Sequence, residues 1–146
     1  MLKRVRLNIH SDIDNLDAVG LPEGEREKSD ESYTASLLLQ GGEYRISYSA
    51  ETEGGRLTTD ITVTENGEVT VARRGAIQSL LVFREGGEFD TVYTVPPYKF
   101  DMHVKTQRLR IALSDKGGSI DILYLMTVGG ASKRCRMRIL AEESVL

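Results

Sequence analysis

Apolar and polar residues alternate along most of the chain, in short runs separated by turn residues. The first run places Val5, Leu7 and Ile9 between charged or amide side chains. A period of two is typical of antiparallel strands with one buried face, because successive side chains of a strand point to opposite sides. Nine further runs of the same kind follow, over residues 44–48, 57–63, 69–71, 77–83, 89–95, 100–104, 109–113, 120–128 and 135–139.

Glycine pairs and one Asn-Gly step separate these runs. Glycine readily adopts the positive φ angles that tight hairpins need, so these positions predict turns. A series of hairpins predicts a meander, and closing the meander removes its two exposed edges. We therefore predict an all-β fold, a closed or nearly closed antiparallel up-and-down barrel of eight to ten strands, as a single domain over residues 1–146.

Residues 11–31 do not follow the alternating pattern. They contain only two basic residues, together with Pro22 and two glycines. Eight acidic residues lie in the same stretch: Asp12, Asp14, Asp17, Glu23, Glu25, Glu27, Asp30 and Glu31. Such a composition favours solvated backbone, so we predict an acidic loop between the first and second strands.

Polar side chains also occur at inward positions. Arg73, Tyr48, Tyr93 and Tyr124 share the parity of their apolar neighbours. An interior guanidinium must be paired or must face a ligand or water, because its desolvation is costly. Alternatively, Arg73 marks a strand end at the wet rim, and the tyrosines are ordinary core residues. The leading hypothesis is that a small, partly apolar ligand binds in or at the mouth of the barrel through these four residues.

Two strands carry arginines at outward positions, namely Arg108 and Arg110 on one, and Arg134, Arg136 and Arg138 on the other. If the strands are near neighbours, these residues form a basic patch that could bind nucleic acid or a protein partner, without catalysis. We favour pairing with the acidic segment or with Asp121, or solvation, over nucleic acid, because no RNA-binding motif accompanies the arginines.

Five apolar residues also fall on the outward parity: Leu38, Leu80, Val82, Leu123 and Leu125. An exposed apolar patch favours association, so we expect either the N-terminal segments or a second copy to cover them. A homodimer is therefore one expectation, beside the small-molecule ligand.

Composition adds mainly exclusions. The net charge of −3 gives no overall attraction to nucleic acid or membranes. Cys135 is the only cysteine, and its parity predicts a small buried residue. His10 and His103 are not in a ligand-spaced motif, so we expect no metal and no cofactor. No nucleophile elbow or phosphate loop is present, which ranks an enzyme last. The charged N-terminus and the lack of long apolar runs predict a cytoplasmic protein without membrane contact.

Several motifs carry a resemblance to a known family. They are residues 44–48 with Glu51, residues 68–71 leading into Arg73 and Gly75-Ala76, residues 81–83, residues 93–96 ahead of Phe100, and residues 120–124 after Gly117-Gly118. From about residue 41 to the C-terminus the chain resembles the YwiB-like family of uncharacterised bacterial proteins. The resemblance implies a calycin-like (lipocalin-like) β-barrel and a cytoplasmic bacterial origin. It supplies no catalytic residues.

Overall fold

The protein is an all-β barrel in a computed structural model that describes residues 2–144. Within this range no helix is long and apolar enough to cross a membrane. The ten strands are β1 (Leu2–Leu16), β2 (Pro22–Gln40), β3 (Glu43–Thr52), β4 (Gly55–Val63), β5 (Val69–Gly75), β6 (Ser79–Phe83), β7 (Glu88–Val95), β8 (Tyr98–Ser114), β9 (Gly117–Val128) and β10 (Ala131–Glu143).

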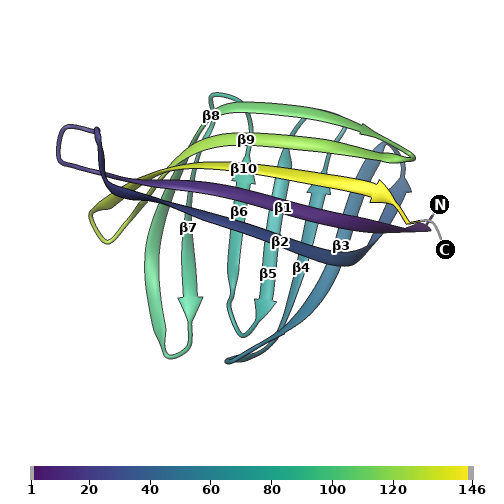
Figure 1. Cartoon of the computed structure of the whole chain (residues 1–146), viewed down its shortest axis with the longest axis horizontal. Helices are drawn as coiled ribbons and strands as arrows, with labels where there is room; N and C mark the ends of the chain where they lie inside the picture. The colour runs from purple at the N-terminus through teal and green to yellow at the C-terminus, as the bar shows by residue number, and fades with distance from the viewer. Residues whose placement is uncertain (1, 145–146) are drawn as a thin grey trace.

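The strands form one antiparallel sheet in the order β6-β5-β4-β3-β2-β1-β10-β9-β8-β7. Each strand therefore pairs with its neighbours in sequence except at β6 and β7, which stand at the two ends of the order, and the first strand pairs with the last. In Figure 1, β8, β9, β10, β1 and β2 cross in front of the more upright strands β3 to β7. The predicted up-and-down barrel is confirmed.

The barrel wall is weakest between β6 and β7. Only one isolated bridge joins these strands, at Gln78 and Thr94. The two residues exchange both backbone hydrogen bonds, with N···O distances of 2.9 and 2.8 Å. By contrast, β1 and β10 pair continuously from Val5–Glu143 to Leu16–Ser132. The barrel is thus nearly closed, and its seam lies in the middle of the sequence.

The prediction of an acidic loop over residues 11–31 is wrong. β1 and β2 pair along this stretch up to Leu16 and Pro22, and the turn occupies only the residues between them. Asp17 organises that turn, since its Oδ1 accepts the N–H groups of Val19 and Leu21. The hairpin projects beyond the barrel (Figure 1), where both of its faces meet solvent and acidic side chains remain hydrated while the backbone is paired.

The runs at residues 100–104 and 109–113 belong to one strand, β8. The register shifts between Thr106 and Arg108, where β8 has a bulge against β9. A bulge adds one residue to a strand and so moves the inward positions from even to odd numbers. In the sequence this shift resembles a boundary between two strands, so β8 gives two separate alternating runs. Among the predicted runs, none covers the stretch that forms β2.

The interior has an apolar half and a polar, aromatic half. Fully buried aliphatic side chains such as Val5, Leu7 and Ile46 fill the half near the chain termini. Tyr33, Tyr48 and Tyr124 belong to the polar half, whereas the inward Tyr44 lies at the start of β3, with its hydroxyl near the backbone oxygen of Leu113. The predicted glycine turns are confirmed at several hairpins, for example by φ angles of +62° at Gly41 and +79° at Gly42.

The outward apolar residues do not form a single patch. Leu80 and Val82 lie on β6, Leu123 and Leu125 on β9, and Leu38 on β2. Leu80 is 40% exposed, and the other four are half-buried. Neighbouring outward side chains therefore cover much of this apolar surface.

Candidate functional site

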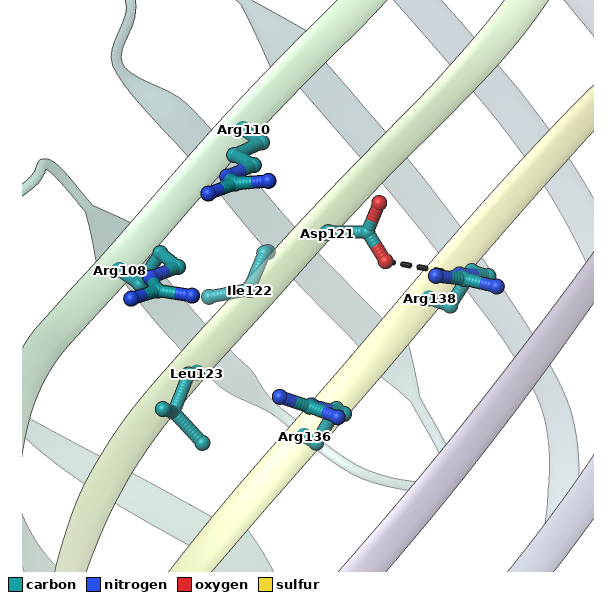
Figure 2. Close-up of a pocket in the computed structure, with 7 residues that line it drawn as sticks. All are labelled: Arg108, Arg110, Asp121, Ile122, Leu123, Arg136 and Arg138. Carbon is teal, nitrogen blue, oxygen red and sulfur yellow. Dashed lines mark hydrogen bonds and ion pairs between the residues drawn. The ribbon is translucent and has the colours of Figure 1, made fainter.

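The five predicted outward arginines come together on the outer surface of β8, β9 and β10. We call Arg108, Arg110, Arg134, Arg136 and Arg138 the arginine face. The strand register aligns Arg110 with Asp121 and Asp121 with Arg138, and it aligns Arg108 with Leu123 and Leu123 with Arg136. Figure 2 shows β8 and β10 presenting their arginines on either side of the β9 residues.

The β8 bulge gives this face its composition. Before the bulge, buried Met102, Val104 and Thr106 occupy even positions. After it, Leu109 and Ile111 face the core, so Arg108 and Arg110 point outward. A regular strand would turn these arginines toward the interior, because a one-residue shift exchanges the two faces.

The ion pairs of the face are incomplete. Arg138 donates from Nε to Oδ1 of Asp121 at 2.8 Å, and this hydrogen bond raises the pKa of Arg138. The predicted pairing with Asp121 is therefore confirmed for one arginine. Arg108, Arg110 and Arg136 have no ion-pair partner among residues 2–144. Like charges are thus held close together with little internal compensation.

Acidic residues of the hairpin border the face. Arg26 donates to both carboxylate oxygens of Asp14, at 2.9 and 3.0 Å, and so lowers the pKa of Asp14. The charge of Arg134, which lies opposite Asp14 on β10, lowers it further. The acidic segment therefore lies beside one edge of the arginine face, and the centre of the face remains cationic.

Two adjoining hollows lie over these strands. The first, of about 140 Å³, is lined by Arg108, Arg110, Asp121, Ile122, Leu123, Arg136 and Arg138 (Figure 2). The second, of about 380 Å³, is lined by Asp12, Asp14, Arg26, Gln107, Leu123, Arg134 and Arg136. Leu123 and Arg136 line both hollows. We call the combined depression the trough, with a cationic end at which Asp121 is paired with Arg138 and a second end that contains Asp12 and Asp14.

Inside the barrel, the structure brings Arg73 close to two of the predicted tyrosines. The register joins Tyr48 to Thr59, Thr59 to Arg73 and Arg73 to Ser79. Burial raises the pKa of Tyr48 and of Tyr124, and the nearby Arg73 charge opposes both shifts. Arg73 is half-buried, and it has no ion-pair partner among the described residues.

Tyr93 lies on β7, half-buried against the core and opposite Phe100 on β8. Tyr124 instead packs on Phe83, with ring centroids 4.8 Å apart. Tyr93 is therefore a wall residue near the seam, while Tyr48 and Tyr124 are buried core residues.

Tyr33 of the polar half and its hydrogen-bond partner Glu31 lie beside and within the stretch that we interpreted as a loop. Tyr33 stacks on Tyr48, and its hydroxyl donates to Oε2 of Glu31 at 2.7 Å. Burial, then this hydrogen bond, raises the pKa of Tyr33. The alternation of Tyr33, Ala35 and Leu37 was the available signal, since all three share an inward parity.

Both histidines lie on strands, and each ring lies within ion-pair distance of two carboxylates. His10 Nδ1 lies 2.6 Å from Asp30, and His103 Nδ1 lies 2.6 Å from Asp90. These contacts raise both histidine pKa values. In the described part of the chain, no group of three or more His, Cys, Asp or Glu side chains is arranged to hold a metal ion.

Cys135 is buried, as its parity predicted, and is 2% exposed. Burial raises the pKa of its thiol to about 11. The thiolate is the nucleophilic form of cysteine, so this environment does not favour thiol chemistry.

Comparisons with known proteins identify a family. The model of a domain of unknown function, DUF1934, matches residues 17–139, which include all of β2 as well as the motifs that carry the resemblance. The crystal structure of the YwiB protein from Bacillus subtilis is similar at a TM-score of 0.79 and 23% identity, over 97% of this chain and 94% of that chain. No curated protein matches the chain. The chain belongs to the DUF1934 family, and it shares the barrel fold of YwiB.

Proposed function

We propose that this protein binds nucleic acid, with the arginine face contacting the phosphate backbone. The carrying observation is that Arg108, Arg110 and Arg136 converge on one hollow without ion-pair partners among residues 2–144. A guanidinium presents a planar fork of donors that matches the oxygens of a phosphate. Uncompensated arginines around one depression are therefore suited to an anionic ligand.

The arrangement of the arginines favours an extended polyanion. Alternate residues of a strand are spaced by about 6.8 Å, so Arg134, Arg136 and Arg138 form a row of regularly spaced cations. Arg108 and Arg110 form a second row on β8, about 10 Å from the first because β9 lies between them. A nucleic-acid strand could place consecutive phosphates along either row.

The surrounding acidity limits the strength of this interaction. The chain carries a net charge of −3, and the hairpin beside the face is acidic, so long-range attraction is weak. Binding would depend on local contacts and would fall steeply with salt. The cytoplasmic location predicted from the sequence would give access to RNA.

Fluorescence anisotropy of a labelled single-stranded 12-mer tests the proposal. The double variant Arg108→Gln/Arg136→Gln should weaken binding and reduce the slope of log K against log salt by about 1.4, or about 0.7 for each lost phosphate contact. The matched control is Arg45→Gln/Arg84→Gln, which removes two exposed arginines outside the face. Equal losses in the two variants would contradict a site on the arginine face.

A second candidate function is small-molecule binding at the polar end of the interior. It is favoured by Arg73, a half-buried inward cation without an ion-pair partner in the described chain, beside Tyr33, Tyr48 and Tyr124. A small carboxylate or phosphate with an apolar body would suit these groups. Tyr93 would contribute from the neighbouring wall.

Native mass spectrometry of protein from its own source tests this candidate. Retained mass that is absent from Arg73→Gln but present in Arg74→Gln would support it. Arg74 is a matched neighbour, because it is exposed and pairs with Asp60 at 3.2 Å. Unchanged retention in Arg73→Gln would remove Arg73 from the site. The same spectra report whether the chain forms the homodimer that the outward apolar residues suggested.

A further inference from the structure

We propose that the trough favours nucleotides whose bases carry an exocyclic amino group, and that Asp12 accepts a hydrogen bond from that group. This inference rests on the proposed function, because it requires a nucleic-acid strand on the arginine face. It adds a selecting residue to an interaction that phosphate contacts alone would leave indifferent to sequence.

The trough connects the two kinds of contact. Arg136 lines both hollows, and Asp12 lies directly opposite it across the β1–β10 ladder. Leu123 also lines both hollows, so an apolar surface lies between the cationic end and the carboxylates. A nucleotide with its phosphate on Arg108 and Arg110 could lay its base over Leu123 with its polar edge toward Asp12.

Of the two carboxylates in the second hollow, Asp12 is the one that is available to a ligand. Both oxygens of Asp14 accept hydrogen bonds from Arg26. Asp12 Oδ1 lies 3.3 Å from His10 Nε2, and the side chain is 18% exposed. Asp12 makes no ion pair with Arg136, and no hydrogen bond to its Oδ2 forms within residues 2–144. Oδ1 is buried without a hydrogen-bond partner in the described part of the chain, so Oδ2 is the oxygen of this partly exposed side chain that remains for a ligand.

The chemistry of the bases sets the selection. Cytosine, adenine and guanine each offer an amino group that can donate to a carboxylate. Thymine and uracil place carbonyl oxygens on both sides of their single N–H, and these oxygens repel a carboxylate. Asp12 would therefore favour cytosine over thymine, two pyrimidines of similar size that differ in the group at position 4.

Anisotropy titrations with labelled oligo(dC) and oligo(dT) 12-mers test the inference. The wild-type protein should bind oligo(dC) roughly three- to tenfold more tightly, as expected for the modest net free energy of one additional hydrogen bond. Asp12→Ala should bring this ratio close to one and strengthen oligo(dT) binding, because it removes a negative charge beside the phosphates. The control Asp60→Ala removes a carboxylate on β4 and should leave the ratio unchanged.

The outcomes separate the two proposals. Salt-dependent binding of both oligomers with equal affinity would overturn the inference and leave the proposed function standing. An Asp12→Ala protein that binds both oligomers more tightly with an unchanged ratio would also overturn it, since Asp12 would then act only through its charge. If neither oligomer binds the wild-type protein, the proposed function fails and the inference fails with it.

Discussion

Tyr33 and Tyr48 stack in the polar half of the interior, with ring centroids 4.2 Å apart and ring planes inclined by 21°. Tyr33 lies on β2 just after the projecting part of the hairpin, whereas Tyr48 belongs to the barrel wall on β3. The ladder between β2 and β3 extends only from Ser36–Ser47 to Gln40–Glu43. The stacked rings therefore attach the hairpin to the barrel beyond the end of that ladder.

Loss of the Tyr48 ring should strongly destabilise the protein. Tyr48 is 8% exposed, and truncation of a buried aromatic residue typically costs about 3–5 kcal/mol. Tyr48→Ala should therefore reduce the free energy of unfolding by about that amount in a urea titration. Tyr98→Ala is the control, since Tyr98 is 65% exposed and its loss should change stability by less than about 0.5 kcal/mol. Similar losses in both variants would contradict this account of the core.

Cys135 should be unreactive while the protein is folded. Its thiol is buried and has a pKa of about 11, so little thiolate exists at pH 8 and reagents have little access. Labelling with a chromogenic disulfide reagent at pH 8 should be slow in buffer and fast in concentrated guanidinium chloride. Rapid labelling of the folded protein would show that Cys135 is more accessible than the structure indicates.

The two histidines should make stability depend on pH. Hydrogen bonds that His10 donates to Asp30 and that His103 donates to Asp90 raise both pKa values above the usual histidine value of about 6.5. Their stabilising contribution is therefore complete below about pH 6.5 and is lost as pH rises through the folded-state pKa values. The His10→Gln/His103→Gln variant should be less stable than wild type at pH 6, and the two should converge at pH 9. NMR titration of the imidazole protons gives the pKa values directly, and unshifted values would contradict this account of the two histidines.

Gly118 should tolerate no side chain. Its φ is +135°, and an added Cβ would collide with the backbone oxygen of Ala112 on β8. Gly118→Ala should cost about 3 kcal/mol, which lowers the thermal midpoint by roughly 6–12 °C. At Gly41 φ is +62° and an added Cβ meets no atom within 4 Å, so Gly41→Ala should cost only about 1 kcal/mol. Equal shifts in the two variants would show that the collision at Gly118 is relieved by backbone movement.

Parity in the sequence was enough to predict the barrel and to separate its inner and outer surfaces. It assigned Tyr48, Tyr124 and Cys135 to the interior, and the structure buries all three. It also placed Arg108 and Arg136 on the outside of separate strands. Their alignment through Leu123 could not be predicted, because it depends on a strand register that alternation alone does not determine.

The projecting hairpin escaped prediction because its residues bury little surface. Alternation signals a strand only when one face is apolar, and residues 18–32 are exposed throughout. These residues of β2 form a strand because their backbone pairs with β1, and the β2 sequence by itself does not show this pairing. Because this pairing was missed, the contact between Tyr33 and Glu31 was not predicted. The pairing of Asp14 with Arg26, beside the arginine face, was not predicted either.

The single bridge between Gln78 and Thr94 is the place where the barrel wall should open most easily. Opening the wall at this place breaks two backbone hydrogen bonds, whereas parting β1 from β10 would break a long continuous ladder. Fluctuations that expose the interior should therefore concentrate where β6 and β7 diverge. Ser79 follows Gln78 directly and pairs with Arg73, so solvent that enters there arrives first at the polar half of the interior. Transient hydration should therefore begin at the polar side chains and reach the aliphatic ones last.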